Sequence, residues 1–304
     1  MRAALEYERR PFAPAYMLRA FWPGARRVTP ATALSARWRG HRVDAGQLAA
    51  FSRITGLPEG PTLPLLYPHT VGFRLSMAVL THPRAPAPIW RVLQIRNSLL
   101  EHRPIASDSV LDFEARATAA RVLEKGLELD LRTTVHVRGE LAWESLVTFY
   151  ARGRFGPPGA PSPLSRAPDL AGAPLADEWT MRDEAHWRFG ALTGDYNGIH
   201  AWDWYARRFG FSRALYHPPR VLGQCLARLS DPPSGAPRRL DAWLKGPVPH
   251  GAAVRLHARS DGGARLFSLH VEPERPSIVG ALREAAPGAR LVDDQGAPLD
   301  PRPE

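Results

Sequence analysis

The sequence predicts an α+β protein of two similar units, each an antiparallel sheet that wraps around a buried helix. Near the end of each half of the chain, successive runs alternate between apolar and polar residues. Mostly apolar segments of helical length precede those runs in both halves. A stretch rich in proline and glycine separates the halves. The residues do not repeat convincingly, but the order of elements does.

The first half ends in three predicted strands. Residues 110–117, 127–137 and 141–150 alternate between apolar and polar side chains, and a turn at 138–140 joins the last two. Period-two runs joined by short turns indicate an antiparallel sheet. Upstream, residues 71–80 (VGFRLSMAVL) are mostly apolar without strict alternation. That pattern predicts a buried helix.

The second half follows the same order. Helices are predicted over residues 183–192, 201–209 and 220–229, and a polar turn at 193–198 follows the first of them. Three further runs predict the strands that close this half: 240–244, 253–258 and 265–271.

Proline accounts for 31 of the 304 residues, about twice the usual share. Residues 156–176 hold a dense cluster of proline and glycine, which removes amide donors and adds chain entropy. This stretch therefore predicts a linker. We divide the chain into an N-terminal unit (1–155), the linker, a C-terminal unit (177–284) and an irregular tail (285–304).

The composition excludes several protein classes. With 44% hydrophobic and 23% charged residues, the chain is globular rather than disordered. The net charge is +10, and all 40 cationic side chains except Lys125 and Lys245 are arginine. These are spread without a basic run, so we expect no nucleic-acid binding, although anionic ligands would be attracted.

The sequence also limits where the protein works. No apolar run approaches the roughly 18 residues of a membrane-spanning helix, so we expect no membrane insertion. The start, MRAALEYERR, lacks the features of a signal peptide. Cys225 is the only cysteine, which rules out an internal disulfide framework and a cysteine metal cluster. We therefore expect a cytoplasmic protein.

Candidate chemistry is concentrated in one segment, TGDYNGIHAWDWYARRFGF, at residues 193–211. It places Asp195, Asn197 and His200 within six residues, in a turn that bends sharply. A carboxylate and an imidazole beside a pocket make an acid–base pair near neutral pH. The alternative is an ordinary helix start, with Asp195 or Asn197 as the cap and His200 exposed.

The same segment resembles the signature of the MaoC-like (R)-specific enoyl-thioester hydratases and 3-hydroxyacyl-thioester dehydratases, G-D-x-N-P-[LIV]-H followed by a helix and G-F. WLKGP at 243–247 looks like a strand start of that family. The segments LPLLYPHTVGFRLSMAVL, RNSLLEHRPI and GELAWESLVTFYARG are similar to the N-terminal half of double-hotdog dehydratases. The residues that fit the signature are Gly194, Asp195, Asn197, Ile199, His200, Ala206, Gly210 and Phe211.

The resemblance implies a double hotdog fold in which only the C-terminal unit is catalytic. The corresponding N-terminal region, 43–56, holds a helix without an acid–histidine pair and would leave its unit to accommodate the acyl chain. Asp195 and His200 would hold one water, Asp195 helping to deprotonate it for attack at C3 and His200 relaying a proton to C2. The implied substrate-binding residues are Asn197, Gly198, Tyr196 and His217.

The resemblance further implies a thioester of coenzyme A or acyl carrier protein as substrate, with no cofactor and no metal. A homodimer of such chains would fit the same group. A non-catalytic acyl-thioester binder on this fold and a hotdog thioesterase stay open as alternatives.

Two residues depart from the family pattern. Gly198 replaces a proline that pre-organises the first helical turn, so we expect a looser loop. Pro218 stands where the family has a glycine whose amide is thought to serve the oxyanion hole, and proline has no amide hydrogen. Arg220 or another backbone amide would then have to replace that donor.

Other conspicuous residues receive structural interpretations. We expect His69 and His102 to have structural roles and Cys225 to fill a buried helix face. Asp203, three residues after His200, makes a poor metal site with it. The tryptophans are expected mainly in the core, including Trp143, Trp187, Trp202, Trp204 and Trp243.

Overall fold

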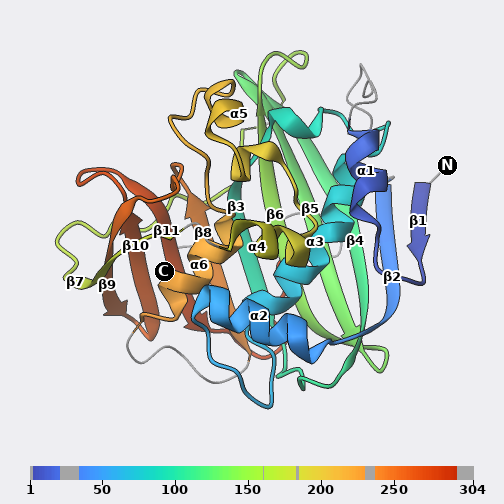
Figure 1. Ribbon diagram of the computed structural model, residues 1–304, viewed down its shortest axis with the longest axis horizontal. Coiled ribbons are helices and arrows are strands. Elements are labelled where there is room, and N and C mark those ends of the chain that lie inside the picture. Colours follow the sequence, from blue (N-terminus) through green and yellow to red (C-terminus); the bar gives the residue numbers. More distant parts are fainter. Residues whose placement is uncertain (1–2, 21–33, 160, 183–184, 230–236, 293–304) are drawn as a thin grey trace.

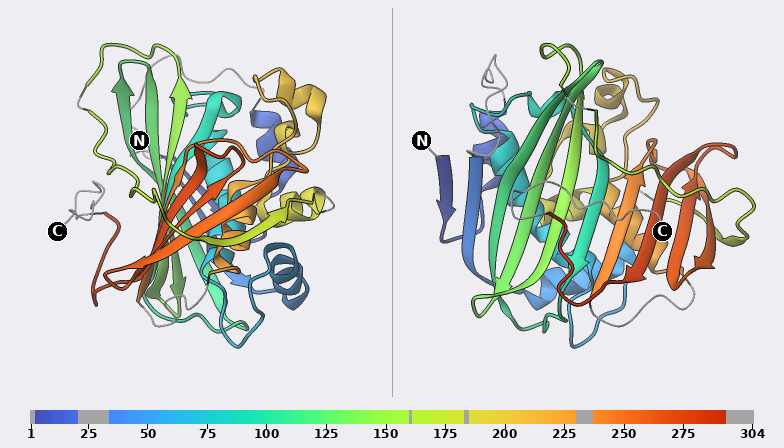
Figure 2. Two further views of the ribbon diagram at one scale, coloured as in Figure 1. Left: turned by 90° about the vertical axis from the view of Figure 1, so that its left-hand side faces the viewer. Right: turned by 180° about the vertical axis from the view of Figure 1, so that it is seen from behind.

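The computed structural model describes residues 3–20, 34–159, 161–182, 185–229 and 237–292. Eleven strands in this part of the chain form one sheet, with helices on one of its faces (Figures 1 and 2). The strands of the first half are β1 (Ala3–Tyr7), β2 (Leu34–Arg42), β3 (Val92–Glu101), β4 (Val110–Leu123), β5 (Gly126–Val137) and β6 (Glu140–Arg152). Those of the second half are β7 (Leu175–Thr180), β8 (Arg238–Leu244), β9 (Ala253–Asp261), β10 (Ala264–His270) and β11 (Pro276–Glu284).

Except for the first helix, which lies between β1 and β2, the helices lie between β2 and β3 in the first half and between β7 and β8 in the second. The first half contributes α1 (Ala13–Arg19), α2 (Ala45–Thr55), α3 (Leu66–Leu80) and the 3-10 turn η2 (Ile89–Arg91). The second contributes α4 (His186–Thr193), the 3-10 turn η3 (Gly198–His200), α5 (Asp203–Arg207) and α6 (Pro218–Leu226). No helix in the described ranges is both long and apolar enough to cross a membrane.

The two halves share one topology. The sheet order is β1-β2-β4-β5-β6-β3-β8-β11-β10-β9-β7. Apart from β1 at one outer edge, each half has five strands, β2 to β6 and β7 to β11. Numbered along the chain and read from the outer edge inward, both sets stand in the order first, third, fourth, fifth and second. The repeated order of elements predicted from the sequence is thus a repeated fold, whose second strands meet at the centre as one antiparallel pair, β3 and β8.

The central pairing of β3 with β8 is reinforced by a buried ionic cluster. Asp241 on β8 accepts hydrogen bonds from Ser98 (2.6 Å) and Arg96 (3.4 Å) of β3. Arg239 and Arg283 also donate to its carboxylate, at 2.8 and 3.0 Å. Burial would raise the pKa of the Asp241 carboxyl, but the arginines outweigh it and lower that pKa. The two predicted sheets are therefore continuous across a seam that carries charge.

Helix α3 is the central helix of the first half. All fifteen of its residues are buried, as expected for a mostly apolar helix wrapped by a sheet. It packs against β2, β4 and β5 and touches α4 and α6 from the second half. The predicted helix at 71–80 is confirmed, and its true start lies five residues earlier.

The predicted strands are confirmed, while several elements were not foreseen. The three strands of the first half correspond to β4, β5 and β6, and those of the second to β8, β9 and β10. β3 was missed because its end is buried on both faces, so it does not alternate. α5 spans only five residues of the predicted helix at 201–209. The predicted helix at 183–192 corresponds to α4, and its residues 183 and 184 lie outside the described residues.

The described residues of the predicted linker and of the predicted tail cross the face of the sheet opposite the helices (Figure 2). Between β6 and β7 the described residues form no helix or strand, and β7 begins at Leu175. The last described residues are irregular but packed rather than frayed. Leu291 and Val292 are buried against Leu100 and Leu146.

Candidate active site

The candidate site begins where α4 ends. Gly194 adopts a left-handed conformation (φ 73°), which terminates the helix and turns the chain. A Cβ at this position would lie 2.1 Å from the Tyr16 hydroxyl and 2.8 Å from Cγ of Arg74. Both the backbone conformation and the packing therefore require glycine immediately before Asp195.

Two local side-chain turns shape the loop after Gly194. The Asp195 amide donates to Oγ1 of Thr193 (3.1 Å), and Oδ1 of Asp195 accepts from the Asn197 amide (3.0 Å). Oδ1 of Asn197 in turn accepts from the Ile199 amide (3.2 Å), which caps η3. The cap predicted as the alternative interpretation is therefore present, and it holds the loop that carries the candidate acid–base pair.

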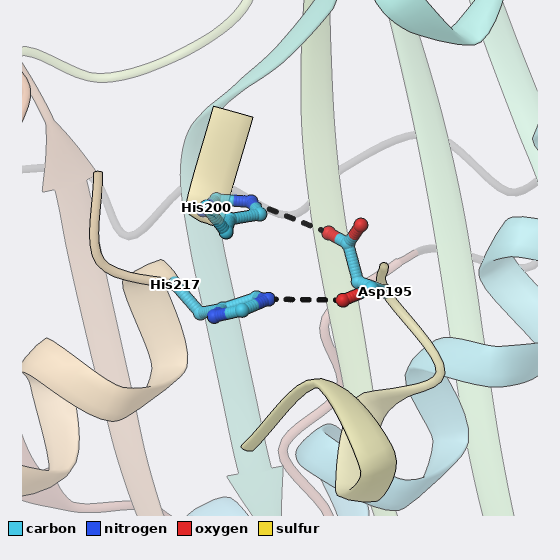
Figure 3. A group of neighbouring side chains, drawn as sticks. All are labelled: Asp195, His200 and His217. Carbon is cyan, nitrogen blue, oxygen red and sulfur yellow. Dashed lines mark hydrogen bonds and ion pairs between the residues drawn. The ribbon is translucent and has the colours of Figure 1, made fainter. Parts of the chain in front are cut away.

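His200 faces Asp195 across this turn (Figure 3). Its Nε2 lies 3.5 Å from Oδ2 of Asp195, and both side chains are 13% exposed. Nδ1 of His200 lies 2.9 Å from the carbonyl oxygen of Leu215. Since a carbonyl only accepts, Nδ1 carries the hydrogen, and in the neutral ring Nε2 is an acceptor. Two acceptors therefore face one another, an arrangement suited to sharing the two hydrogens of one water.

His217 supports this pair from below (Figure 3). Its ring stacks on that of His200 with centroids 3.8 Å apart and an angle of 24°, and its Nε2 donates to the backbone oxygen of Asp195 (3.1 Å). Burial, followed by the charge of His200, lowers the pKa of His217 to about 3. His217 is therefore a neutral hydrogen-bond donor that fixes the Asp195 backbone.

Asp195 remains ionised in this environment. Burial alone would raise the pKa of its carboxyl, but a protonated His200, through its hydrogen bond and its charge, lowers that pKa to about 2, and His217 adds to this effect. The amide of Asn197 contributes in the same direction. A carboxylate of such low pKa stays ionised near neutral pH and is a weak base.

Asp195, His200 and His217 also form the group of possible metal ligands in the described residues, with ligand atoms within 4.8 Å of one another. Their hydrogen bonds argue for acid–base chemistry instead. Nε2 of His217 would have to give up its bond to the Asp195 carbonyl before it offered a lone pair to an ion.

A cavity of about 480 Å³ adjoins the pair. Asp195, Asn197 and His200 line it from the second half. The rest of its wall is mostly apolar and comes from both halves, with Phe73, Met77 and Phe149 from the first and Val221 and Ile278 from the second. The cavity therefore lies between the halves, with polar groups gathered on one side of an otherwise apolar space.

The other predicted site residues lie outside the cavity wall. Tyr196 is partly exposed, and its hydroxyl interacts with Arg74. Gly198 is buried beneath the rings of Trp202 and Tyr205, and a Cβ there would lie 2.9 and 3.0 Å from them. The glycine at this position is therefore a tightly packed contact, not the loose point that the missing proline led us to expect.

Residues of the first half hold the loop that carries Asp195, and no local sequence pattern pointed to them. The Tyr16 hydroxyl donates to the carbonyl oxygen of Gly194 (2.8 Å). Arg74 of α3 donates to the carbonyl oxygens of Ala191 and Pro11. The bonds to Gly194 and Ala191 join positions more than 100 residues apart, so no local pattern reveals them.

Pro218, which also lines the cavity, begins α6. Neither Pro218 nor Pro219 has an amide hydrogen. The amides of Arg220 and Val221 both donate to the carbonyl oxygen of His217, at 3.0 and 3.3 Å. The Arg220 side chain is buried and donates to the carbonyl oxygen of Arg182. The expected replacement of the missing donor by Arg220 is therefore not supported.

The histidines and the cysteine with structural interpretations lie away from the acid–base pair. His69 is buried within α3, and burial lowers its pKa to about 4. His102 pairs with Glu144, Nε2 to Oε1, at 3.2 Å. Cys225 is buried on α6, and burial raises the pKa of its thiol to about 12, so it is not a poised nucleophile.

Comparison with known proteins places this geometry in context. No family model matches the chain. The chain is 29% identical over 243 residues to 3-hydroxyacyl-thioester dehydratase X of Mycobacterium tuberculosis, covering 79% of this chain and 86% of the relative. A crystal structure of that protein, HtdX, aligns with a TM-score of 0.68 at 26% identity, covering 82% of this chain and 99% of HtdX.

Two further solved structures share the fold. A MaoC-like dehydratase from Phytophthora capsici aligns with a TM-score of 0.67 at 16% identity, over 83% of this chain and 95% of that protein. A Mycobacterium tuberculosis protein with a double hotdog fold aligns with a TM-score of 0.53 at 16% identity, over 80% and 95% of the two chains. The repeated strand order of this chain is therefore the double hotdog fold.

Proposed function

We propose that this chain, a member of the MaoC-like family with a double hotdog fold, is a hydro-lyase that acts on acyl thioesters. It would hydrate trans-2-enoyl thioesters to (R)-3-hydroxyacyl thioesters and catalyse the reverse dehydration. The observation that carries this proposal is the 3.5 Å approach of two hydrogen-bond acceptors, Nε2 of His200 and Oδ2 of Asp195, at the wall of a largely apolar cavity.

The proposed reaction uses one water held between these two acceptors. The water donates one hydrogen to each of them, which leaves a lone pair directed at C3 of the substrate. As the C3–O bond forms, one water proton passes to His200 and the C2–C3 π electrons move toward the thioester oxygen. The His200 imidazolium then returns that proton to C2. Dehydration reverses each step, so atoms and charges balance.

Asp195 has a distinct part in this scheme. Because the protonated His200 lowers the pKa of the Asp195 carboxyl to about 2, Asp195 remains a carboxylate beside the imidazolium. We therefore assign the transient proton to His200, while Asp195 orients the water and stabilises the charged ring. The Leu215 carbonyl keeps the hydrogen on Nδ1 and thereby leaves Nε2 free to accept.

The thioester oxygen needs a donor as negative charge develops on it. The amides that follow Pro218 are already used within α6. The side chain of Asn197 lines the cavity, and its Oδ1 is fixed by the Ile199 amide. Fixing Oδ1 also fixes the amide nitrogen, so we propose Nδ2 of Asn197 as the donor to the thioester oxygen.

The two halves would divide the work. We propose that the unit 1–155 supplies the wall for the acyl chain and the unit 177–284 supplies the reacting groups. Phe73, Met77 and Phe149 line the cavity from the first unit, which fits burial of an alkyl chain. Coenzyme A and acyl carrier protein both remain candidate carriers of the thioester.

The test is hydration of short-chain and medium-chain trans-2-enoyl-CoA by the native protein, Asp195→Asn and His200→Ala. Enoyl loss without release of free thiol is expected, with the rate falling on the order of 10²–10⁴-fold in both variants. Chiral chromatography of the product should show the (R)-3-hydroxyacyl thioester. Asp261→Asn, which changes an acid at the β9–β10 turn, is the control and should keep native activity.

Two results would redirect the proposal. Thiol release by the native protein would identify a thioesterase. Binding of enoyl-CoA and of an acyl-carrier-protein thioester, with no turnover of either by a folded native protein, would identify a non-catalytic acyl binder.

Asn197 is tested separately. Asn197→Ser keeps an oxygen able to cap η3 but removes the amide donor. If Nδ2 binds the thioester oxygen, kcat falls on the order of 10²–10³-fold while the melting temperature stays close to native. Unchanged turnover would exclude Asn197 as the donor.

A further inference from the structure

Three tryptophans that the sequence led us to expect in the core are exposed instead. Trp187, Trp202 and Trp204 are 46, 44 and 58% exposed, and the nearby Phe209 is 39% exposed. Trp143, by contrast, is fully buried, as expected. Exposed clusters of large apolar side chains on a protein surface mark interaction sites.

The exposed rings form one continuous surface. Trp187 meets Trp202 edge-on with centroids 5.7 Å apart, and Trp202 stacks on Trp204 at 6.0 Å. Tyr205 lies against Trp204 at 5.7 Å and against Phe209 at 5.1 Å. We call these five residues the aromatic patch. Its rings hold one another in place, so presenting them to a partner costs little side-chain entropy.

Arginine side chains surround the aromatic patch. Arg207, Arg208 and Arg213 belong to the same segment and are exposed, as is Arg188 beside Trp187. The guanidinium of Arg208 lies over the Trp204 ring, 5.8 Å from its centroid.

Asp203 is the only acid between residues 202 and 213, and its carboxylate is already engaged. It accepts from the Ala214 amide at 2.8 Å and pairs with Arg213 at 3.9 Å. The patch is therefore aromatic at its centre and cationic at its rim.

The aromatic patch adjoins the cavity of the candidate active site. Phe209, which belongs to the patch, also lines the cavity, as does Phe211 two residues later. Trp202 and Tyr205 cover Gly198, three residues after Asp195. Figure 1 places α5, which carries much of the patch, at the rim of the molecule near one end of the central strands. A surface that seats against the patch would therefore lie beside the route to the acid–base pair.

We propose that the aromatic patch docks this protein on an anionic lipid surface. Indole rings settle at the boundary between headgroups and acyl chains, where one side is apolar and the other wet. Arginine binds phosphate groups, and each cation near an anionic membrane strengthens attachment. The protein docks at the surface without a spanning helix, as a peripheral protein does.

Charge favours a lipid surface over a second copy of the chain. The protein carries +10, so two copies would repel one another across two cationic patches. Docking also has a use that rests on the proposed function, since acyl thioesters with long chains partition into membranes. The cavity would then take such substrates from the lipid surface to which the patch is attached.

Co-sedimentation with vesicles tests the docking directly. The full-length protein should bind vesicles of phosphatidylcholine with 30% phosphatidylglycerol more tightly than vesicles of phosphatidylcholine alone, and added salt should weaken that binding. Trp204→Ser with Arg208→Gln should reduce the partition coefficient at least tenfold. Loss of one arginine alone accounts for about a fivefold effect, and the indole supplies the rest.

A matched control removes one exposed apolar residue and one arginine elsewhere. Leu175→Ser with Arg255→Gln alters the β7–β9 edge and should keep native binding. Equal loss in both double variants would overturn the proposal, because it would reflect net charge alone. Absence of binding by the native protein would overturn it too, and so would binding of an acidic carrier protein through the patch without vesicle binding.

The assay separates docking from catalysis. Neither Trp204 nor Arg208 lines the cavity, so Trp204→Ser with Arg208→Gln should hydrate a water-soluble short-chain enoyl-CoA at the native rate. With a long-chain substrate in anionic vesicles, the same variant should be slower by the factor lost in binding. Short-chain turnover without vesicle binding would leave the proposed function standing and remove the docking site.

Discussion

The Tyr16 hydroxyl donates a hydrogen bond of 2.8 Å to the carbonyl oxygen of Gly194, the residue immediately before Asp195. Tyr16 belongs to α1 of the first half, whereas Gly194 and Asp195 belong to the second half. Burial raises the pKa of Tyr16 above its ordinary value, so the hydroxyl remains a donor. A residue of the half without the acid–base motif therefore helps to position the carboxylate of the half that has it.

Removing this hydroxyl should slow turnover more than it weakens substrate binding. Tyr16→Phe keeps the ring and loses one buried hydrogen bond, worth about 1 kcal/mol of stability. Because small displacements of reacting groups are costly, we expect kcat to fall on the order of tenfold with KM nearly unchanged. Tyr150→Phe is the matched control, since its hydroxyl donates to the Lys125 carbonyl at the same distance. A tenfold loss in both variants would contradict the positioning role of Tyr16.

A side chain at Gly198 should disturb the loop through the rings above it. In Gly198→Ala the new Cβ would lie within 3.0 Å of Trp202 and Tyr205, so η3 has to shift and activity should fall about tenfold. Adding Trp202→Ala should restore part of that loss, which a double-mutant cycle measures. Gly60→Ala is the control because a Cβ there meets nothing within 4 Å. Strict additivity of the two changes would exclude the packing explanation.

His217 should make the protein lose stability in mild acid. Its pKa is about 3 in the folded protein and near 6.5 in an unfolded chain, so only the unfolded chain gains this proton between those values. Its contribution is complete above pH 6.5 and declines toward pH 3, by at most about 1.4 kcal/mol per pH unit. Urea unfolding at pH 7.5, 6 and 5 should show a shallower decline for His217→Gln.

Two other buried histidines leave a residual pH dependence. Burial lowers the pKa of both His41 and His69 to about 4, so His217→Gln reduces the decline without abolishing it. Cys225→Ser is the control, because it changes a buried side chain of α6 without altering any group that titrates in this range. An identical pH profile for the native protein and His217→Gln would contradict the buried neutral state of His217.

Asp241→Asn should weaken the junction of the two halves. The carboxylate neutralises arginines from β3, β8 and β11 within the sheet, and removing one partner of a buried ionic cluster costs about 3–5 kcal/mol. Thermal unfolding should therefore begin well below the native midpoint. Asp261→Asn removes an exposed partner of Arg259 and should change stability by less than about 0.5 kcal/mol. Equal effects of the two changes would show that the seam does not depend on Asp241.

Residue patterns local to the sequence predicted several strands and the candidate acid–base pair. Alternation identified β4, β5 and β6, because apolar and polar side chains point to opposite faces of each strand, even where the polar ones are buried. Asp195, Asn197 and His200 lie within six residues, so a single turn brings the acid and the imidazole together. This short segment also carried the signature of the family resemblance, which WLKGP at 243–247 and three segments of the first half extended.

Only the tertiary structure decided the features that join distant residues. The pairing of β3 with β8 joins residues more than 130 positions apart, and the order of the eleven strands depends on it. The same holds for the bond of Tyr16 to Gly194 and for the cavity wall formed by Phe73 and Phe149. Hydrophobic spacing records which residues are buried within an element, but which remote surface covers them is set by how all the elements pack together.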